Sequence, residues 1–216
     1  MKVSKSYAVF GLGRYGYAVA TELVNSGAEV LAIDMDQTTV NSAIADIPYC
    51  KCADVTDAEV IRRLGIANMD AVIVAMANHL EASVMAVMLC KEAGVNTVIA
   101  KGSDEMHCKV LSRVGADRVV FPESESGKRL AKNLLSSGFV DVVDLSDGVS
   151  IIELDVKPEW VGHSLIELDL RKKYSVNIIA IRCGEALRVD IDPKMPLTED
   201  MNLVVITDSS KLSKLK

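Results

Sequence analysis

The first part of the chain alternates between short apolar runs and longer stretches with apolar residues at helical spacing. Runs such as Tyr7–Phe10 and Asp70–Ala75 are almost wholly apolar, as in strands buried on both faces. Between them, Tyr15–Ser26 places its apolar residues on one helical face and stops at Gly27. The predicted strands are Tyr7–Phe10, Glu29–Ile33, Tyr49–Cys52, Asp70–Ala75, Thr97–Ala100 and Arg118–Phe121. The predicted helices are Tyr15–Ser26, one capped by Asp36, one running from the cap Asp57 to near Gly65, Leu80–Ala93 and Asp104–Val114. Strands separated by helices of this length are typical of repeated βαβ units, so the pattern predicts a doubly wound parallel sheet of the α/β class.

The pattern changes after Pro122. One more helix is predicted at Glu123–Leu135, followed by a break at Ser136–Gly138. From there the elements shorten and become rich in strands. The predicted strands are Ser150–Val156, Val176–Arg182, Ala186–Asp190 and Leu203–Thr207, with a short helix near Ser164–Lys172. We therefore predict two domains, a doubly wound domain at 1–138 and a small α+β domain at 139–216.

Composition agrees with this fold class and limits the function. Half of the 216 residues are hydrophobic but only 4% are aromatic, so the core is aliphatic, which suits a buried parallel sheet. No apolar run approaches the roughly 20 residues that span a bilayer, and no signal peptide is recognised, so we expect a soluble, cytoplasmic protein. The net charge of −6 and the lack of a basic cluster argue against nucleic-acid binding. The five scattered cysteines do not suggest a disulfide framework.

The motif Gly11-Leu12-Gly13-Arg14-Tyr15-Gly16 lies between the first predicted strand and the first helix. In a dinucleotide-binding loop the first glycine permits a tight turn, the second lets the backbone approach a phosphate, and the third allows close helix–strand packing. The helix N-terminus also offers free N–H groups and partial positive charge to an anion. Asp34 follows at the end of the next strand, where an acid accepts hydrogen bonds from ribose hydroxyls. The combination predicts a Rossmann-like nucleotide site rather than a glycine turn alone.

Polar residues follow three further predicted strands. Asp54 follows the third strand, Asn78 and His79 follow the fourth, and Lys101 follows the fifth. In an open parallel sheet the ligand lies beyond the carboxyl ends of the strands, so we expect these four residues near the nucleotide. The positive charge of Lys101 is suited to a phosphate.

The sequence shows no machinery for converting a bound nucleotide. Its only histidines are His79, His107 and His163, and we expect His107 on the surface of its helix, in no motif. No nucleophile elbow, zinc set, paired-carboxylate motif or sizeable substrate domain is visible, so we predict a binding protein and not an enzyme. Two alternatives stay open: an NAD-dependent oxidoreductase whose catalytic residues are unrecognised, and a redox-sensing regulator using the same domain.

Several stretches occur together in a familiar order. After the glycine loop and its acid come GIANMDAVIVAMANHLEASVMAV (Gly65–Val87), KGSDEMHCKVLSRVGADRVVFPE (Lys101–Glu123) and GHSLIELDLRKKYSVNIIAI (Gly162–Ile181). In this order the chain resembles RCK (regulator of K+ conductance) proteins of the KtrA/TrkA family, with a TrkA-N domain followed by a TrkA-C domain. The resemblance covers nearly the whole chain.

The resemblance implies a regulatory subunit of bacterial potassium uptake that binds ATP or ADP, with NAD(H) as a further possible ligand. It implies that Arg14 contacts the terminal phosphates across a dimer, that Asp34 holds the ribose, that Asp54 faces the adenine and that Lys101 supports phosphate. It also places Glu123 near the dimer interface, where it can take part in binding a divalent or monovalent cation; the alternative is a helix N-terminal acid stabilised by the dipole.

The resemblance further implies how the protein assembles. Homodimers would build a higher ring, an octamer, at the inner face of the cell membrane beneath a KtrB/TrkH-like subunit, and ATP and ADP would favour different ring shapes. Some relatives bind cyclic di-AMP at a dimer interface of the second domain. The residues of this chain in the matching region are Leu165, Ile166, Arg171, Asn177 and Ile178. The alternative is that the apolar members are dimer core and Arg171 is a solvated charge.

Overall fold

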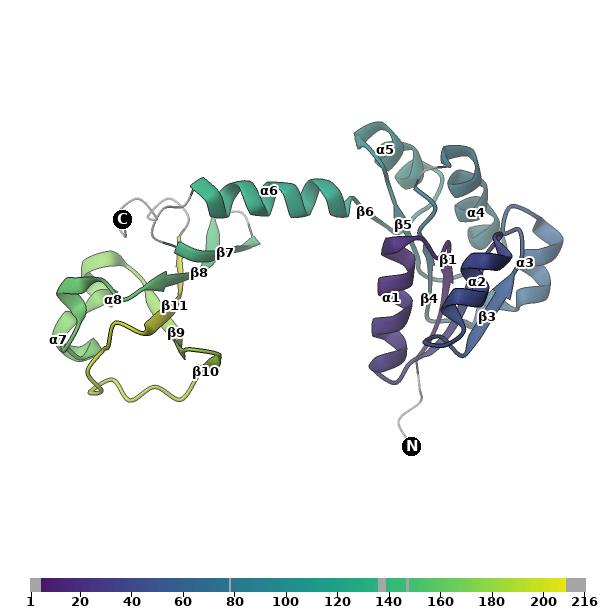
Figure 1. The fold of residues 1–216 in the computed structure, drawn as a ribbon. Coiled ribbons are helices and arrows are strands. Elements are labelled where there is room, and N and C mark those ends of the chain that lie inside the picture. The colour runs from purple at the N-terminus through teal and green to yellow at the C-terminus, as the bar shows by residue number, and fades with distance from the viewer. Residues whose placement is uncertain (1–4, 78, 136–138, 147, 209–216) are drawn as a thin grey trace. The chain divides into compact units, whose positions relative to one another are not determined.

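In the computed structural model the described residues are 5–77, 79–135, 139–146 and 148–208. They form two compact units, Met1–Pro122 and Glu123–Lys216, which we call the first and second units. Figure 1 draws the first unit in purple to teal and the second in green to yellow. Each unit has its own sheet and its own hydrophobic core.

The first unit is a six-stranded parallel sheet in the order β3-β2-β1-β4-β5-β6. Its strands are β1 (Ser6–Phe10), β2 (Glu29–Asp34), β3 (Tyr49–Cys52), β4 (Ala71–Val74), β5 (Val98–Lys101) and β6 (Arg118–Val120). Its helices are α1 (Arg14–Asn25), α2 (Gln37–Ala43), α3 (Ala58–Leu64), α4 (Leu80–Glu92) and α5 (Glu105–Arg113), with a 3-10 turn η1 at Ile66–Asn68. The predicted doubly wound parallel sheet is confirmed.

The two faces of this sheet carry separate cores. On one face, residues of β1, β2 and β4 pack with Ala20 of α1 and with Ala43 of α2. On the other face, residues of β1, β4 and β5 pack with Ile61 of α3, Val87 of α4 and Leu111 of α5. Because both faces are covered, β4 is buried along its whole length, which explains the continuous apolar run DAVIVA.

Local signals in the sequence set the helix boundaries. The carboxylates of Asp36, Asp57 and Asp104 each accept backbone N–H groups in the first turn of α2, α3 and α5. Helix α3 ends at Gly65 in the left-handed conformation, with φ of 66°. The predicted caps Asp36 and Asp57 and the predicted end near Gly65 are therefore confirmed, while Asp104, predicted as the first residue of its helix, is its N-cap.

The second unit contains a five-stranded antiparallel sheet in the order β10-β9-β11-β8-β7. The strands are β7 (Phe139–Ser146), β8 (Val149–Asp155), β9 (Asn177–Cys183), β10 (Ala186–Arg188) and β11 (Met201–Asp208). The helices are α6 (Pro122–Leu135), α7 (Leu165–Leu168) and α8 (Leu170–Tyr174), with a 3-10 turn η2 at Pro158–Trp160. The predicted small α+β architecture is confirmed, although strand β7 was not predicted.

The short helix expected near Ser164–Lys172 is two helices. Ser164 and Glu167 form a capping box at the start of α7. Asp169 then adopts the left-handed conformation, with φ of 46°, which ends α7 and starts α8 in a new direction. The sequence has no glycine or proline at this point, so the break is not marked by the usual residue types.

The boundary between the units also differs from the prediction. The units divide between Pro122 and Glu123, so α6 belongs with the second unit, whereas the sequence placed the boundary after Gly138. Among the described side chains of α6, Leu130 is 59% and Leu134 is 76% exposed, and neither belongs to the two core clusters of the first unit. The predicted break at Ser136–Gly138 lies outside the described residues.

Candidate nucleotide-binding site

The glycine loop lies at the point where the strand order of the first sheet reverses. Strand β1 has β2 on one side and β4 on the other, and the chain leaves β1 through Gly11. The N–H of Ala75, just after β4, donates to the carbonyl of Phe10 at 2.7 Å. Ligands of open α/β sheets bind in the crevice at such a reversal, so the topology places a binding site at this loop.

The glycines of the loop differ in what they contact. Gly11 has φ of +88°, and a Cβ added there would lie 2.7 Å from the Met76 Cγ. A Cβ added at Gly16 would overlap the carbonyl oxygen of Gly11, so this glycine permits the close approach of α1 to the loop. Gly13, by contrast, has φ of −63° and no atom within 4 Å of an added Cβ. Packing within the chain therefore requires Gly11 and Gly16, while Gly13 faces open space.

Asp34 lies beside this loop. One carboxylate oxygen, Oδ2, accepts the Leu12 N–H at 2.7 Å, and the other, Oδ1, accepts the Asp36 N–H at 2.9 Å. A carboxylate has about four acceptor positions, so two remain for the hydroxyls of a ribose. Leu12 was not among the predicted site residues, because a backbone donor leaves no mark on the sequence.

The remaining strand-end residues have different surroundings. Asp54 accepts the Thr56 hydroxyl at 2.7 Å and the Thr56 N–H at 2.9 Å, and these bonds lower the pKa of Asp54. His79 is exposed at the N-cap of α4. The Lys101 Nζ lies 5.7 Å from the centre of the Tyr15 ring, which connects the end of β5 with the glycine loop. Tyr15 was not predicted, and Asn78 lies outside the described residues.

Arg14 and Glu123 are two further residues whose roles the resemblance implies. Arg14 is exposed and is the first residue of α1, next to Gly13. Glu123 is exposed in the first turn of α6, and it belongs to the second unit. The glycine loop and Glu123 thus lie in different units.

The expectation that His107 is a surface residue is wrong. Its side chain is 3% exposed, and both ring nitrogens have partners. Nε2 lies 2.8 Å from the Ser83 hydroxyl, and Nδ1 lies 3.0 Å from the Ser103 hydroxyl. The helical period of α5 places His107 on the same face as the buried Leu111, four residues later, and this spacing was the signal that could have shown it.

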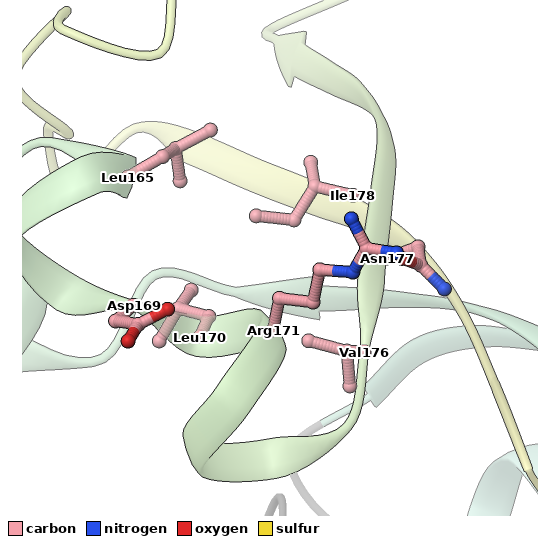
Figure 2. A pocket seen from close by; sticks show the side chains of 7 residues that line it. All are labelled: Leu165, Asp169, Leu170, Arg171, Val176, Asn177 and Ile178. Carbon is pink, nitrogen blue, oxygen red and sulfur yellow. The ribbon is translucent and has the colours of Figure 1, made fainter.

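The second unit contains a pocket of about 250 Å³ between α7, α8 and β9 (Figure 2). Its lining residues are Leu165, Asp169, Leu170, Arg171, Val176, Asn177 and Ile178. Of the five residues proposed for cyclic di-AMP, all but Ile166 line it; Ile166 is 56% exposed. Figure 2 shows the Arg171 side chain extending from α8 toward the start of β9. The lining combines apolar side chains with the guanidinium of Arg171, the amide of Asn177 and the carboxylate of Asp169, as small-molecule sites combine apolar walls with a few polar groups.

The sequence matches two family models: the TrkA-N domain over residues 7–122 and the TrkA-C domain over residues 149–216. The chain therefore belongs to the TrkA family of RCK-type potassium uptake proteins. It is 36% identical to Ktr system potassium uptake protein C of Bacillus subtilis (strain 168), over 98% of this chain and 97% of that protein. It is 32% identical to Ktr system potassium uptake protein A of Vibrio alginolyticus, over 98% of this chain and 97% of that one.

Solved structures support the same fold. The GsuK channel superposes with a TM-score of 0.71 at 18% identity, covering 99% of this chain and 39% of the channel chain. The same channel bound to NAD gives a TM-score of 0.68 at 18% identity, covering 99% of this chain and 39% of the other.

Two features are absent from the part of the chain that the structure describes. No helix among them is long and apolar enough to cross a membrane. Nor do the described residues bring three or more His, Cys, Asp or Glu side chains together as a metal-binding group.

Proposed function

We propose that this chain is a nucleotide-sensing regulatory subunit of a potassium uptake system, acting by binding rather than by catalysis. One observation carries the proposal: the switch point of the first sheet presents an open glycine, Gly13, next to a backbone N–H that is held by Asp34. The full-length similarity to Ktr potassium uptake proteins supports the cellular role.

The ligand of the first unit is proposed to be ATP or ADP. Asp34 has acceptor positions left for ribose hydroxyls, and the N-terminus of the 12-residue helix α1 begins at the loop. Arg14 beside the loop and Lys101 at the end of β5 are the cations proposed to meet the phosphates. Asp54 is proposed to lie by the adenine, and Glu123 of a neighbouring copy to help hold a cation with the phosphates. NAD(H) is the alternative ligand, because the GsuK channel of the same fold is bound to NAD.

Regulation is proposed to work through a population shift. Copies of the chain would form dimers and a larger ring, an octamer, on the cytoplasmic side of a KtrB/TrkH-like membrane subunit. A nucleotide moves such a ring only if it binds one ring state more tightly than the other. The proposed sensor is thus the difference in affinity for ATP and ADP between two ring states.

Calorimetry on the full-length chain with ADP, ATP and NADH tests the ligand. We expect Asp34→Ala to weaken ADP and ATP alike, by about 1.5–3 kcal/mol for a charge-assisted hydrogen bond, or roughly tenfold to a hundredfold. Asp57→Ser is a matched control, because it removes a carboxylate at the start of α3 but keeps a capping oxygen. Unchanged affinity in Asp34→Ala would contradict the proposed site, and binding of NADH alone would assign the ligand to the dinucleotide.

Assembly and partner are tested separately. Light scattering at micromolar concentration should give a species several times the 23.3 kDa of the chain. A monomer with and without nucleotide would count against the ring. Pull-down of the tagged chain from membranes that contain a Ktr or Trk membrane subunit should recover that subunit.

A second candidate function is binding of cyclic di-AMP by the second unit, supported by the pocket of Figure 2. Arg171 suits a phosphate, while Leu165 and Ile178 suit the face of a base. At about 250 Å³ the pocket falls below the usual range of ligand sites, so a second copy would complete it. We expect Arg171→Ala to abolish most binding in a cyclic di-AMP titration and to leave ADP affinity unchanged. Lys173→Ala, a neighbouring exposed cation of α8 that does not line the pocket, is the control.

A further inference from the structure

The buried imidazole of His107 joins helix α4 to the loop after β5, at the edge of the first sheet where the candidate site lies. Its Nε2 lies 2.8 Å from the hydroxyl of Ser83, which is in the second turn of α4 and fully buried. Its Nδ1 lies 3.3 Å from the backbone N of Ser103, in the loop between β5 and α5. His107 itself is on α5, so a single side chain connects α5, α4 and the loop after β5.

The hydrogen bonds fix which ring nitrogen carries the proton. The backbone N–H of Ser103 can only donate, so the Nδ1 that it meets at 3.3 Å is an acceptor. A neutral imidazole then carries its proton on Nε2, which lies 2.8 Å from the Ser83 hydroxyl oxygen. That oxygen can accept this proton while the hydroxyl donates to the Leu80 carbonyl at 2.9 Å. The neutral imidazole with its proton on Nε2 satisfies every one of these contacts.

Each end of this bridge holds a segment that carries a candidate ligand residue. Ser103 is two residues after Lys101, and Gly102 between them is buried and donates its N–H to the Val120 carbonyl at 2.9 Å. The backbone N–H of Ser83 donates to the His79 carbonyl at 2.9 Å, so the Ser83 turn is tied to the start of α4. The bridge therefore sets the spacing between the end of β5 and the start of α4.

Packing alone does not require a polar group here. Replacing both partners of a buried hydrogen bond by apolar side chains of the same shape can leave the stability of a protein nearly unchanged. A buried polar group, by contrast, is costly unless all its hydrogen-bond partners are present. An imidazole bonded through both nitrogens constrains the elements around it, because one of its hydrogen bonds is lost if α4 or the loop after β5 shifts. Such a group is suited to holding a geometry.

We propose that His107 is a positioning residue of the nucleotide site, which fixes the end of β5 relative to the start of α4 and so holds Lys101 where it meets the phosphates. The inference rests on the proposed nucleotide binding and adds to it a residue that contacts no ligand. Its effect is transmitted through Lys101.

A double-mutant cycle measured by ADP calorimetry on the full chain tests this. We expect His107→Leu to weaken ADP by about threefold to tenfold, the range of one net hydrogen bond. In the Lys101→Ala background the same change should cause no further loss. In the Asp34→Ala background, which affects the ribose end, the full loss should persist. Ser83→Ala removes the hydroxyl at one end of the bridge and keeps the imidazole, and it should show the same pattern of losses. It provides a second variant if His107→Leu does not fold.

The ring nitrogens give an independent measurement on the wild-type chain. Long-range ¹H–¹⁵N NMR should show His107 with its proton on Nε2. The tautomer protonated on Nδ1 would overturn the bridge, as would equal losses in the Lys101→Ala and wild-type backgrounds. Unchanged ADP affinity in both His107→Leu and Ser83→Ala, with wild type binding normally, would overturn the inference alone. No binding of ADP, ATP or NADH by wild type would overturn the proposed function together with it.

Discussion

The two units place their candidate sites by different means. In the first unit a parallel sheet is covered on both faces, and the site lies where the strand order reverses beside β1. In the second unit an antiparallel sheet carries one core cluster. The pocket lies between the four-residue helix α7, the five-residue helix α8 and the start of β9. Topology alone locates the first site, whereas the second depends on a helix break at one aspartate. The position of the first site is thus set by the order of the strands, and that of the second by the conformation of one residue, Asp169.

The glycine loop offers the strongest test of this difference. Gly16→Ala should destabilise the first unit by about 3 kcal/mol or more, because the new Cβ overlaps the Gly11 carbonyl and backbone must move. Gly13→Ala, in the same loop, meets no atom within 4 Å and should leave stability nearly unchanged while weakening ADP. Far-UV circular dichroism during urea unfolding measures the change.

The second unit serves as an internal control in that experiment. The single tryptophan of the chain, Trp160, is 3% exposed in the second unit's core. Its fluorescence should report an unchanged transition in Gly16→Ala if the units are energetically separate. A shift of the tryptophan transition by the same amount would show that the two units unfold as one.

The next largest effect is expected at Arg14. A guanidinium that bonds the γ-phosphate stabilises ATP but not ADP, so Arg14→Ala should weaken ATP by about 1.5–3 kcal/mol, or roughly tenfold to a hundredfold, and ADP by much less. Arg14→Lys keeps the charge but loses the bidentate geometry, and it should lie in between. Paired calorimetric titrations provide the measurement. Equal losses for the two nucleotides would place ATP/ADP discrimination elsewhere.

A smaller and opposite effect is expected in the second unit. Ser175 ends α8 in the left-handed conformation, with φ of 58°, where a side chain is unfavourable. Ser175→Gly should therefore stabilise the second unit by about 1 kcal/mol, seen as a higher urea midpoint of the Trp160 fluorescence. Ser175→Ala, which keeps a Cβ, is the control and should give no such gain.

The smallest effect concerns pH. The Thr39 hydroxyl and backbone N–H groups of α2 lower the pKa of Asp36. The backbone N–H of His107 lowers the pKa of Asp104 in the same way. A carboxyl whose pKa is lowered in the folded state stabilises that state fully at pH values above its unfolded pKa, near 4. This stabilisation is lost as the pH falls through the folded pKa. Urea midpoints should thus decline below about pH 4. Asp36→Asn retains a capping oxygen that does not titrate, so its decline should be shallower; a midpoint that rises on acidification would contradict the assignment.

Much of the first unit was predictable because its signals are local. Alternating runs gave all six parallel strands, and Asp36, Asp57 and Asp104 marked helix starts. The motif also imposes steric requirements, and the close contacts that an added Cβ would make at Gly11 and Gly16 agree with the packing roles predicted for these two glycines.

What could not be predicted depends on contacts that no local pattern records. The Leu12 N–H is a backbone donor, and Tyr15 meets Lys101 only through tertiary structure. His107 was misplaced because a polar residue was assumed to face water, although its spacing from Leu111 pointed inward. In the second unit, the left-handed Asp169 split a helix without any glycine, and only the family resemblance indicated the pocket.

The two hydrogen bonds accepted by Asp34 bear on the affinity and the selectivity of the proposed ligand binding. Its carboxylate already holds the Leu12 and Asp36 N–H groups, so this part of the loop would need little further ordering to take the proposed nucleotide. The entropic penalty of association would then be small at the sugar, and ATP and ADP would receive the same benefit there. Uniform binding of this kind raises occupancy without distinguishing ligands. Under the proposed function, the energy that separates ATP from ADP would therefore come from the phosphate end, where Gly13 leaves open space for a ligand.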